Sequence, residues 1–202
     1  IRDSLSLYQL TIEPGTRFAT EHARGAFALP ADDDAAAMYT ATAEEAARFG
    51  LLPYEVSNYA RPGAESRHNL AYWRYGDYLG IGAGAHQRLE LGGALLAARR
   101  HRAPESWLSL VEREGHARVE EMALAPEERG REALLMGLRL AEGIDPARVE
   151  RRSGRPLADL VEPAVLQACL EEDYLRWSPE GRLVATTEGR LRLDAMLPAL
   201  LR

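Results

Sequence analysis

Residues 5–57 begin with Leu5-Ser6-Leu7-Tyr8-Gln9-Leu10 and end with Tyr54-Glu55-Val56-Ser57, and this stretch indicates the fold class. The first run alternates as a strand does, and the last run predicts a second short strand. Between them, apolar residues recur at helical spacing from Asp32 to the terminating Gly50. A strand, a helix and a strand within about fifty residues form a βαβ unit, with parallel strands and a right-handed crossover. The sequence therefore predicts an α/β fold.

This topology also predicts where functional residues gather. In α/β barrels and open α/β sheets, chemistry takes place in the loops that follow the C-terminal ends of the strands. Here those loops are Thr11–Phe18 and Asn58–Trp73, and the second leads into Arg67–His86, a window dense in aromatic, arginine and glycine residues. We therefore expect the functional site to begin in the loop Asn58–Trp73.

The second half of the chain predicts mainly helices. His86–Glu90 and Ala94–Arg100 flank Leu91-Gly92-Gly93 as a hairpin, and Pro104–Glu114 has the pattern of a short helix. Three helices, a second hairpin and a last helix follow, which is the order of a winged-helix domain. They are predicted at Pro126–Ala141, 145–152, Pro156–Glu172, 175–185 and after Thr186. The predicted domains are therefore residues 1–103 and residues 104–202.

The charge distribution argues against nucleic acid as a partner. The formal net charge is −6, and a nucleic-acid-binding surface needs a basic patch. Pro156–Glu172, which would be the recognition helix of a winged-helix domain, contains acidic residues and no basic one. A helix of this charge is unsuited to face phosphates. We expect the second domain to serve a structural or protein-docking role.

Two absences in the composition exclude several kinds of chemistry. All 25 cationic residues are arginine, so no Schiff-base or P-loop lysine exists in this chain. Cys169 is the single cysteine, so the chain itself can form neither a disulfide framework nor a thiolate metal site. Its apolar neighbours predict a small core residue. With no apolar span of bilayer length and no signal peptide, we expect a cytoplasmic protein without an integral membrane segment.

The window Arg67–His86 combines the residue types that a haem site needs. Neutral imidazole ligates haem iron, so His68 is the candidate iron ligand, with Asn69 beside it. Tyr72 and Trp73 could stack on the porphyrin, and Arg67 and Arg74 could pair with its two propionates. The alternative is a loop histidine that is hydrogen-bonded to the backbone beside a small aromatic cluster.

Other patterns in the chain lack the context that their chemistry requires. Gly80–Ala85 matches G-x-G-x-x-A, but no helix of useful length follows it, so close backbone packing is the better interpretation. Ser57, His68 and Asp77 lack the nucleophile elbow of a hydrolase. Three further histidines show no metal-ligand spacing, although the first could line the same cavity as His68. They are His86, His101 and His116.

Four runs of the sequence resemble the HemW family of radical-SAM proteins over nearly the whole chain. They are Leu7–Thr16, Tyr54–Ala60, His68-Asn69-Leu70-Ala71-Tyr72-Trp73 and Thr186–Arg190. This family is related to oxygen-independent coproporphyrinogen III oxidase, and its members are regarded as haem chaperones. The His-Asn-x-x-Tyr-Trp string is the family's haem-associated motif. Gln87 departs from the small residue that many relatives carry.

The resemblance implies a fold and a set of site residues. It implies the C-terminal portion of a partial (β/α) radical-SAM barrel, followed by a helical winged-helix-like domain. It makes His68 the iron ligand, with Asn69, Tyr72 and Trp73 as its supporting motif. The family's Cys-x-x-x-Cys-x-x-Cys would lie upstream of Ile1, so a 4Fe-4S cluster and S-adenosyl-L-methionine would bind mostly outside this chain.

The resemblance also implies a function, with an alternative from another class. A haem-binding chaperone would hold haem near His68 and deliver it to a haem-acceptor protein, with a homodimer as a possible assembly. The alternative is an oxygen-independent coproporphyrinogen III oxidase, which performs oxidative decarboxylation with S-adenosyl-L-methionine and a 4Fe-4S cluster. Because Cys169 alone cannot hold that cluster, we expect this chain by itself to be inactive as an enzyme.

Overall fold

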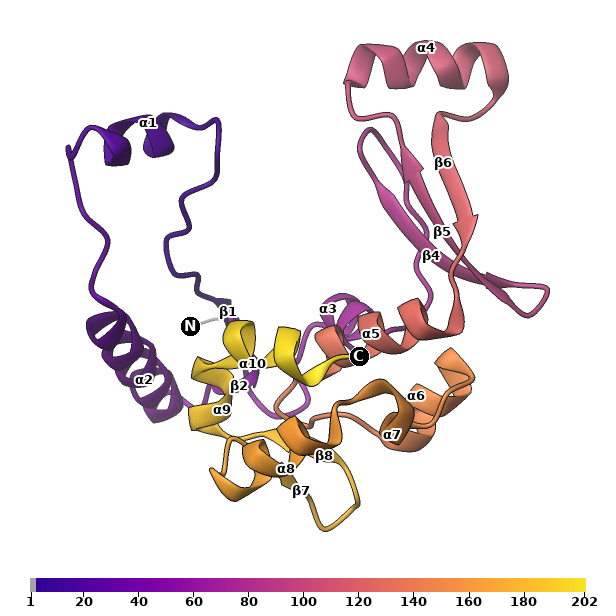
Figure 1. Cartoon of the computed structure of the whole chain (residues 1–202). Helices are drawn as coiled ribbons and strands as arrows, with labels where there is room; N and C mark the ends of the chain where they lie inside the picture. The colour runs from indigo at the N-terminus through magenta and orange to yellow at the C-terminus, as the bar shows by residue number, and fades with distance from the viewer. Residues whose placement is uncertain (1–2) are drawn as a thin grey trace. The chain divides into compact units, whose positions relative to one another are not determined.

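The computed structural model describes residues 3–202 and contains two compact units, one that ends at Ser66 and one that comprises Arg67–Arg202 (Figure 1). Each unit combines helices with small antiparallel sheets. The predicted mixture of helices and strands is therefore confirmed. The boundary between these compact units lies at residues 66/67, whereas the predicted domains are residues 1–103 and 104–202. The predicted domain division stays a prediction.

The first unit contains a three-stranded antiparallel sheet. Its strands are β1 (Ser4–Ser6), β2 (Leu52–Glu55) and β3 (Asn58–Ala60), in the order β1-β3-β2. The predicted pairing of adjacent parallel strands is wrong, because β3 lies between β1 and β2 and runs antiparallel to both. The two outer strands do share one direction. β1 is shorter than the predicted strand Leu5–Leu10, and β2 begins two residues before the predicted strand Tyr54–Ser57 and ends two residues before it.

A buried polar network explains why the chain reverses after β2. The side chain of Glu55 is fully buried and accepts hydrogen bonds from the backbone N–H of Ser57 at 3.0 Å and from Nδ2 of Asn58 at 2.7 Å. The Ser6 hydroxyl donates to Oδ1 of Asn58 at 2.6 Å. The Glu55 carboxylate thus holds the turn that starts β3, and Asn58 connects β3 to β1.

The long helix of the first unit lies where the sequence predicts it. α2 (Asp32–Arg48) has three aspartates in its first turn, where negative charge stabilises the positive end of the helix dipole. Ala46 on this helix packs with Leu51 and Tyr59 in a small core. The helix therefore covers the sheet side chain of Tyr59, which is 1% exposed.

A second helix of this unit was not predicted. α1 (Arg17–Ala23) begins within the predicted loop Thr11–Phe18. The hydroxyl of Thr16 accepts a hydrogen bond from the N–H of Ala19 at 3.2 Å, which is the geometry of a helix N-cap. A cap followed by seven residues without a regular apolar period gives little signal in the sequence.

The second unit contains the predicted hairpin. β4 (His86–Leu91) pairs with β5 (Ala94–Arg100), and both turn residues, Gly92 and Gly93, have positive φ angles of 59° and 80°. Two central residues with φ above zero form the turn that matches the twist of paired strands. β6 (Arg118–Ala123), which was not predicted, adds an exposed third strand along β5.

The helix between β5 and β6 has the predicted bounds. α4 (Pro104–Glu114) begins with a proline at its first turn and ends at Gly115, whose φ of 75° lies in the left-handed region. Figure 1 shows α4 crossing the far end of the sheet of β4, β5 and β6. Hairpin, helix and added strand thus form one projecting element of the second unit.

The rest of the second unit is helical, with one further hairpin. The elements are α5 (Pro126–Gly137), α6 (Pro146–Ser153), α7 (Leu157–Leu160), α8 (Pro163–Glu171), β7 (Leu175–Trp177), β8 (Leu183–Ala185), α9 (Thr187–Leu191) and α10 (Leu193–Leu200). The predicted hairpin and the cap at Thr186 are confirmed, since Thr186 accepts a hydrogen bond from Gly189 at 3.0 Å. The winged-helix likeness stays a prediction.

The predicted helix Pro156–Glu172 is divided in two. Val161 has an extended backbone and forms an isolated bridge with Leu201, so helix α7 ends before it. Pro163 then begins α8, because proline lacks the N–H that a helix interior requires. Cys169 on α8 is buried, and burial raises the pKa of its thiol, as expected for a core residue. Across residues 3–202, every helix is too short or too polar to cross a membrane.

Candidate functional site

The predicted haem-associated motif lies on a helix. α3 (Arg67–Trp73) occupies the second part of the predicted loop Asn58–Trp73, and β3 occupies its beginning, so the loop prediction is wrong for both segments. On a helix, residues four apart in sequence share one face. His68 and Tyr72 are therefore neighbours, which a loop would not require.

His68 is exposed, at one end of a row of aromatic rings. Its Nε2 is hydrogen-bonded to the hydroxyl of Tyr72 at 3.0 Å, and the two rings meet edge to face with centroids 4.7 Å apart. The ring of Tyr72 in turn meets Tyr78 at 4.5 Å. Burial raises the pKa of the Tyr78 hydroxyl, so this phenol stays neutral. The imidazole is thus held by aromatic contacts and remains open to solvent.

Two other residues of the predicted haem site, Arg74 and Trp73, contact side chains of this chain. Nε and Nη2 of Arg74 each donate to Glu142 at 2.8 Å, a bidentate ion pair. The guanidinium carbon of Arg139 lies 4.7 Å from the centroid of the Trp73 ring, which covers part of that ring. Arg74 is therefore paired within the fold, and its role toward a propionate stays a prediction. Arg67 is exposed and Asn69 is half-buried at the start of α3.

Tyr75, which no sequence pattern singles out, connects the motif to the helical part of the unit. Tyr75 is buried, has a φ of 52°, and donates from its hydroxyl to Oε2 of Glu132 on α5 at 2.7 Å. Arg88 on β4 donates to the same carboxylate at 2.6 and 2.9 Å. Burial and the bond to Glu132 raise the pKa of Tyr75. The segment that follows helix α3, strand β4 and helix α5 thus meet at the carboxylate of Glu132.

This carboxylate remains charged despite its partial burial. Burial alone would raise the pKa of Glu132, but hydrogen bonds from Arg88 and Tyr75 and the charge of Arg88 outweigh it, so the pKa lies below its usual range. The side chains of Arg88 and Glu132 are 19% and 27% exposed, so solvent screens the pair only in part. The network therefore fixes the position of the segment that follows α3.

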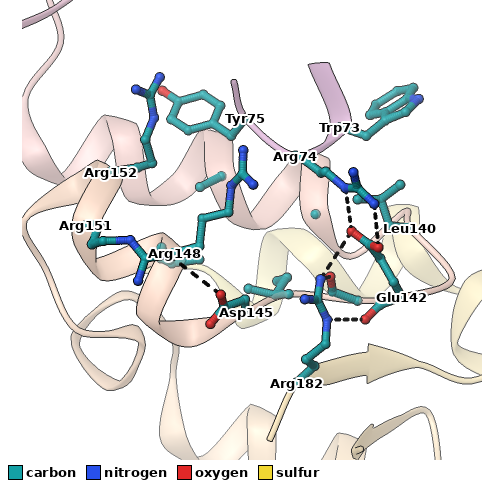
Figure 2. A pocket seen from close by; sticks show the side chains of 15 residues that line it. Trp73, Arg74, Tyr75, Leu140, Glu142, Asp145, Arg148, Arg151, Arg152 and Arg182 are labelled. Atoms are coloured by element: carbon teal, nitrogen blue, oxygen red, sulfur yellow. Dashed lines mark hydrogen bonds and ion pairs between the residues drawn. The ribbon is translucent and has the colours of Figure 1, made fainter. Parts of the chain in front are cut away.

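A cavity of about 210 Å³ opens beside this segment, and we call it the arginine pocket (Figure 2). Trp73, Arg74 and Tyr75 form one wall, and α5, α6 and the loop between them form most of the rest. Glu142 in that loop accepts hydrogen bonds from Arg74, and these bonds lower the pKa of its carboxyl. The positive charges of Arg74, Arg182 and Arg148 lower this pKa further, so it lies below the usual range although burial raises it. Five arginines line the pocket: Arg74, Arg148, Arg151, Arg152 and Arg182.

Within the glycine run after the motif, Gly80 serves close backbone packing. A side chain at Gly80 would collide with the carbonyl oxygen of His86, and Tyr78 bridges to Arg88 just before it. Only glycine fits such a close approach of two backbones. Among residues 3–202, no group of three or more histidine, cysteine or acidic side chains is placed to hold a metal ion. His86 lies on β4 and is absent from the lining of the arginine pocket.

Comparison with known proteins places the chain among porphyrin-related radical-SAM proteins. Residues 124–192 match the model of the HemN C-terminal domain family. Over 98% of its length the chain is 35% identical to the zebrafish (Danio rerio) "Radical S-adenosyl methionine domain-containing protein 1, mitochondrial". Over 97% it is 32% identical to "Heme chaperone HemW" of Bacillus subtilis (strain 168). It covers 46% and 50% of these relatives, so it spans about half of their length.

A solved structure shares the fold. The chain of "Coproporphyrinogen III oxidase (HemN) from Escherichia coli is a Radical SAM enzyme" aligns with a TM-score of 0.69 over 98% of this chain and 47% of that one. The two sequences are 19% identical, so this similarity concerns the fold alone. The predicted resemblance is confirmed by the family match, the relatives and the shared fold.

Proposed function

This chain belongs to the HemW-type radical-SAM proteins, whose C-terminal half it spans, and on that premise we propose that it binds haem as cargo for delivery to an acceptor protein. His68 is the proposed iron ligand. The observation that carries this proposal is the exposed imidazole of His68, which helix α3 presents beside the rings of Tyr72 and Tyr78. Relatives named heme chaperones, 30% to 33% identical to this chain, support the same function.

The residues of α3 fit an iron porphyrin in two respects. An exposed neutral imidazole is a good haem ligand, and neighbouring aromatic rings offer apolar contact to a flat macrocycle. Nε2 of His68 is hydrogen-bonded to Tyr72, so this bond has to be replaced when Nε2 binds iron. Asn69 and Trp73 remain proposed supporting residues, and Arg67, which is exposed, remains the proposed partner of a propionate.

We propose radical-SAM chemistry only for the whole protein, of which this chain is one part. A 4Fe-4S cluster needs several thiolates, whereas this chain supplies the single, buried Cys169. We propose that cluster and S-adenosyl-L-methionine bind through residues outside this chain. Homodimer formation, a haem acceptor and a cytoplasmic location complete the proposal, and the scarcity of cysteine agrees with a reducing compartment.

The proposal is tested by haem titration of the purified protein, followed in the Soret band. His68→Ala should weaken haem binding about tenfold or more and shift the band, because it removes the proposed iron ligand. His116→Ala, which removes another exposed imidazole of the same unit, should leave both unchanged. An identical affinity and spectrum in His68→Ala would remove His68 as the ligand.

A further inference from the structure

The arginine pocket has more positive charge than its own acids neutralise. Glu142 and Asp145 are the acidic residues that line it, against five arginines. Four of these arginines are ion-paired within the described part of the chain. The pairs are Arg74–Glu142 at 2.8 Å, Arg182–Glu142 at 3.3 Å, Arg151–Asp145 at 3.8 Å, Arg152–Asp77 at 2.7 Å and Arg152–Glu90 at 2.8 Å.

Arg148 is the fifth arginine, and it has no ion pair among residues 3–202. Figure 2 shows its guanidinium between those of Arg74 and Arg152. Partial burial of its guanidinium lowers the pKa of Arg148, and the charges of Arg74 and Arg152 lower it further, more than Glu142 offsets. Like charges gathered without a counter-charge cost free energy unless an anion joins them.

Arg152, which also lines this pocket, has a buried donor without an acceptor. Nε of Arg152 is buried and makes no hydrogen bond within residues 3–202, although the two Nη atoms of this side chain donate to Asp77 and Glu90. Buried polar groups in folded proteins nearly always have a partner. Arg148 and Arg152 are four residues apart on α6, so they lie on one face of that helix.

We propose that the arginine pocket is an oxyanion site, with Arg148 as the binding residue for one carboxylate of its ligand. A guanidinium donates two parallel N–H bonds, which match the two oxygens of a carboxylate. The cavity of about 210 Å³ accepts the charged end of a ligand, and Trp73 and Leu140 add apolar contact beside it. No sequence pattern singles out Arg148, because its unpaired state depends on which acids the fold brings to its neighbours.

The oxyanion that binds at Arg148 could come from two kinds of ligand. One is a small free anion such as citrate or phosphate. The other is a propionate of a porphyrin, and this source rests on the proposed function, since α3 contributes both His68 and the pocket residues Trp73 and Arg74. Arg148 would then serve the propionate in the role predicted for Arg74, whose guanidinium is paired with Glu142.

The test is calorimetric titration of the purified protein with four probes: sodium citrate, inorganic phosphate, haem, and haem dimethyl ester. The esters remove the carboxylates and keep the iron. Arg148→Ala is the test variant, and it is expected to fold because Arg148 is exposed. Arg113→Ala on α4 is the control, since it removes the same charge from the same unit away from the pocket.

We expect at least one carboxylate or phosphate probe to bind about tenfold more weakly to Arg148→Ala and unchanged to Arg113→Ala. Weaker haem binding with an unchanged dimethyl ester identifies a propionate as the ligand, whereas weaker citrate or phosphate binding alone identifies a small anion. Equal binding of all probes to Arg148→Ala, or no anion binding by the unchanged protein, overturns the proposal. His68→Ala separates the two ideas, because it should affect haem and leave citrate untouched.

Discussion

The hydroxyl oxygen of Tyr72 lies 3.0 Å from Nε2 of His68, and the two rings meet edge to face. The nitrogen that the proposed function assigns to haem iron is therefore already engaged within helix α3. A hydrogen bond of this kind contributes about 1 kcal/mol net to the state in which it forms. Tyr72 thus orients the imidazole and also competes with iron for its nitrogen.

Tyr72→Phe should therefore raise haem affinity about fivefold, because it frees Nε2 of His68 and keeps the aromatic ring. Soret titration measures the change. Tyr78→Phe is the control, since its hydroxyl is one ring further from His68, and it should leave the affinity as it is. A loss of affinity in Tyr72→Phe would mean that the hydroxyl positions the imidazole more than it competes.

Glu132→Gln should lower the free energy of unfolding by about 2 kcal/mol at neutral pH. The carboxylate accepts bonds from Tyr75 and Arg88, and hydrogen bonds to charged groups contribute about 1.5–3 kcal/mol. Denaturant unfolding gives the value. Glu127→Gln on the same helix breaks a more exposed pair with Arg155 and should cost less than about 1 kcal/mol. Equal losses in both variants would contradict a special role for Glu132.

The same carboxylate predicts a pH dependence. The folded pKa of Glu132 lies below its ordinary value of 4.5, so its contribution to stability is complete above that value. The contribution is lost as the pH falls through the folded pKa, because the unfolded state then binds the proton more readily. The difference in unfolding free energy between the unchanged protein and Glu132→Gln should be largest at neutral pH and shrink in acid. A difference that stays constant down to a pH of about 3 would contradict this account.

Glu142→Gln should strengthen anion binding in the arginine pocket several-fold. Glu142 neutralises Arg74 and Arg182, so its replacement by a neutral side chain leaves more positive charge for a ligand. Calorimetry with citrate measures the effect. Glu150→Gln, which removes an acid from the exposed surface of α6, is the matched control. Weaker citrate binding in Glu142→Gln would show that the ion pairs shape the site rather than compete with the ligand.

Local patterns in the sequence predicted the elements with strong signals. The hairpin of β4 and β5 follows from alternating side chains around Gly92-Gly93, and α2 follows from three aspartates ahead of a helical period. Helix α3 was not predicted, because seven residues are too few for a helical period to stand out in the sequence. The strand β3 has only three residues, which is too short for a clear strand pattern. The turn before it depends on the buried Glu55, and a glutamate in a sequence is normally expected on the surface.

The candidate site was predicted only in part, for a different reason. His68 and Tyr72 are four residues apart, so their pairing is local and is found once the helix is known. The bond from Tyr75 to Glu132 spans 57 residues and that from Arg74 to Glu142 spans 68. No local pattern encodes such contacts, since they depend on how helices pack. For this reason the pairing of Arg74 with Glu142 could not be foreseen from the sequence.

The first unit allows a final test, because one carboxylate holds its strand order. Glu55→Ala removes the acceptor for the Ser57 N–H and for Nδ2 of Asn58, inside a site that is fully buried. Loss of a buried acceptor that leaves its donors unpaired costs about 3 kcal/mol. We expect faster amide hydrogen exchange in residues 52–60 and unchanged exchange in the hairpin of β4 and β5, which belongs to the other unit.

The matched control is Glu65→Ala, which removes an acid whose bond to the Gly63 N–H is exposed, and it should leave the exchange of residues 52–60 unchanged. Retained protection of these amides in Glu55→Ala would show that backbone pairing alone places β3 between β1 and β2. Fast exchange confined to residues 52–60 would instead assign that placement to the side chain of Glu55. In that case the order β1-β3-β2, which replaces the predicted parallel pair, depends on a buried acid rather than on strand propensity.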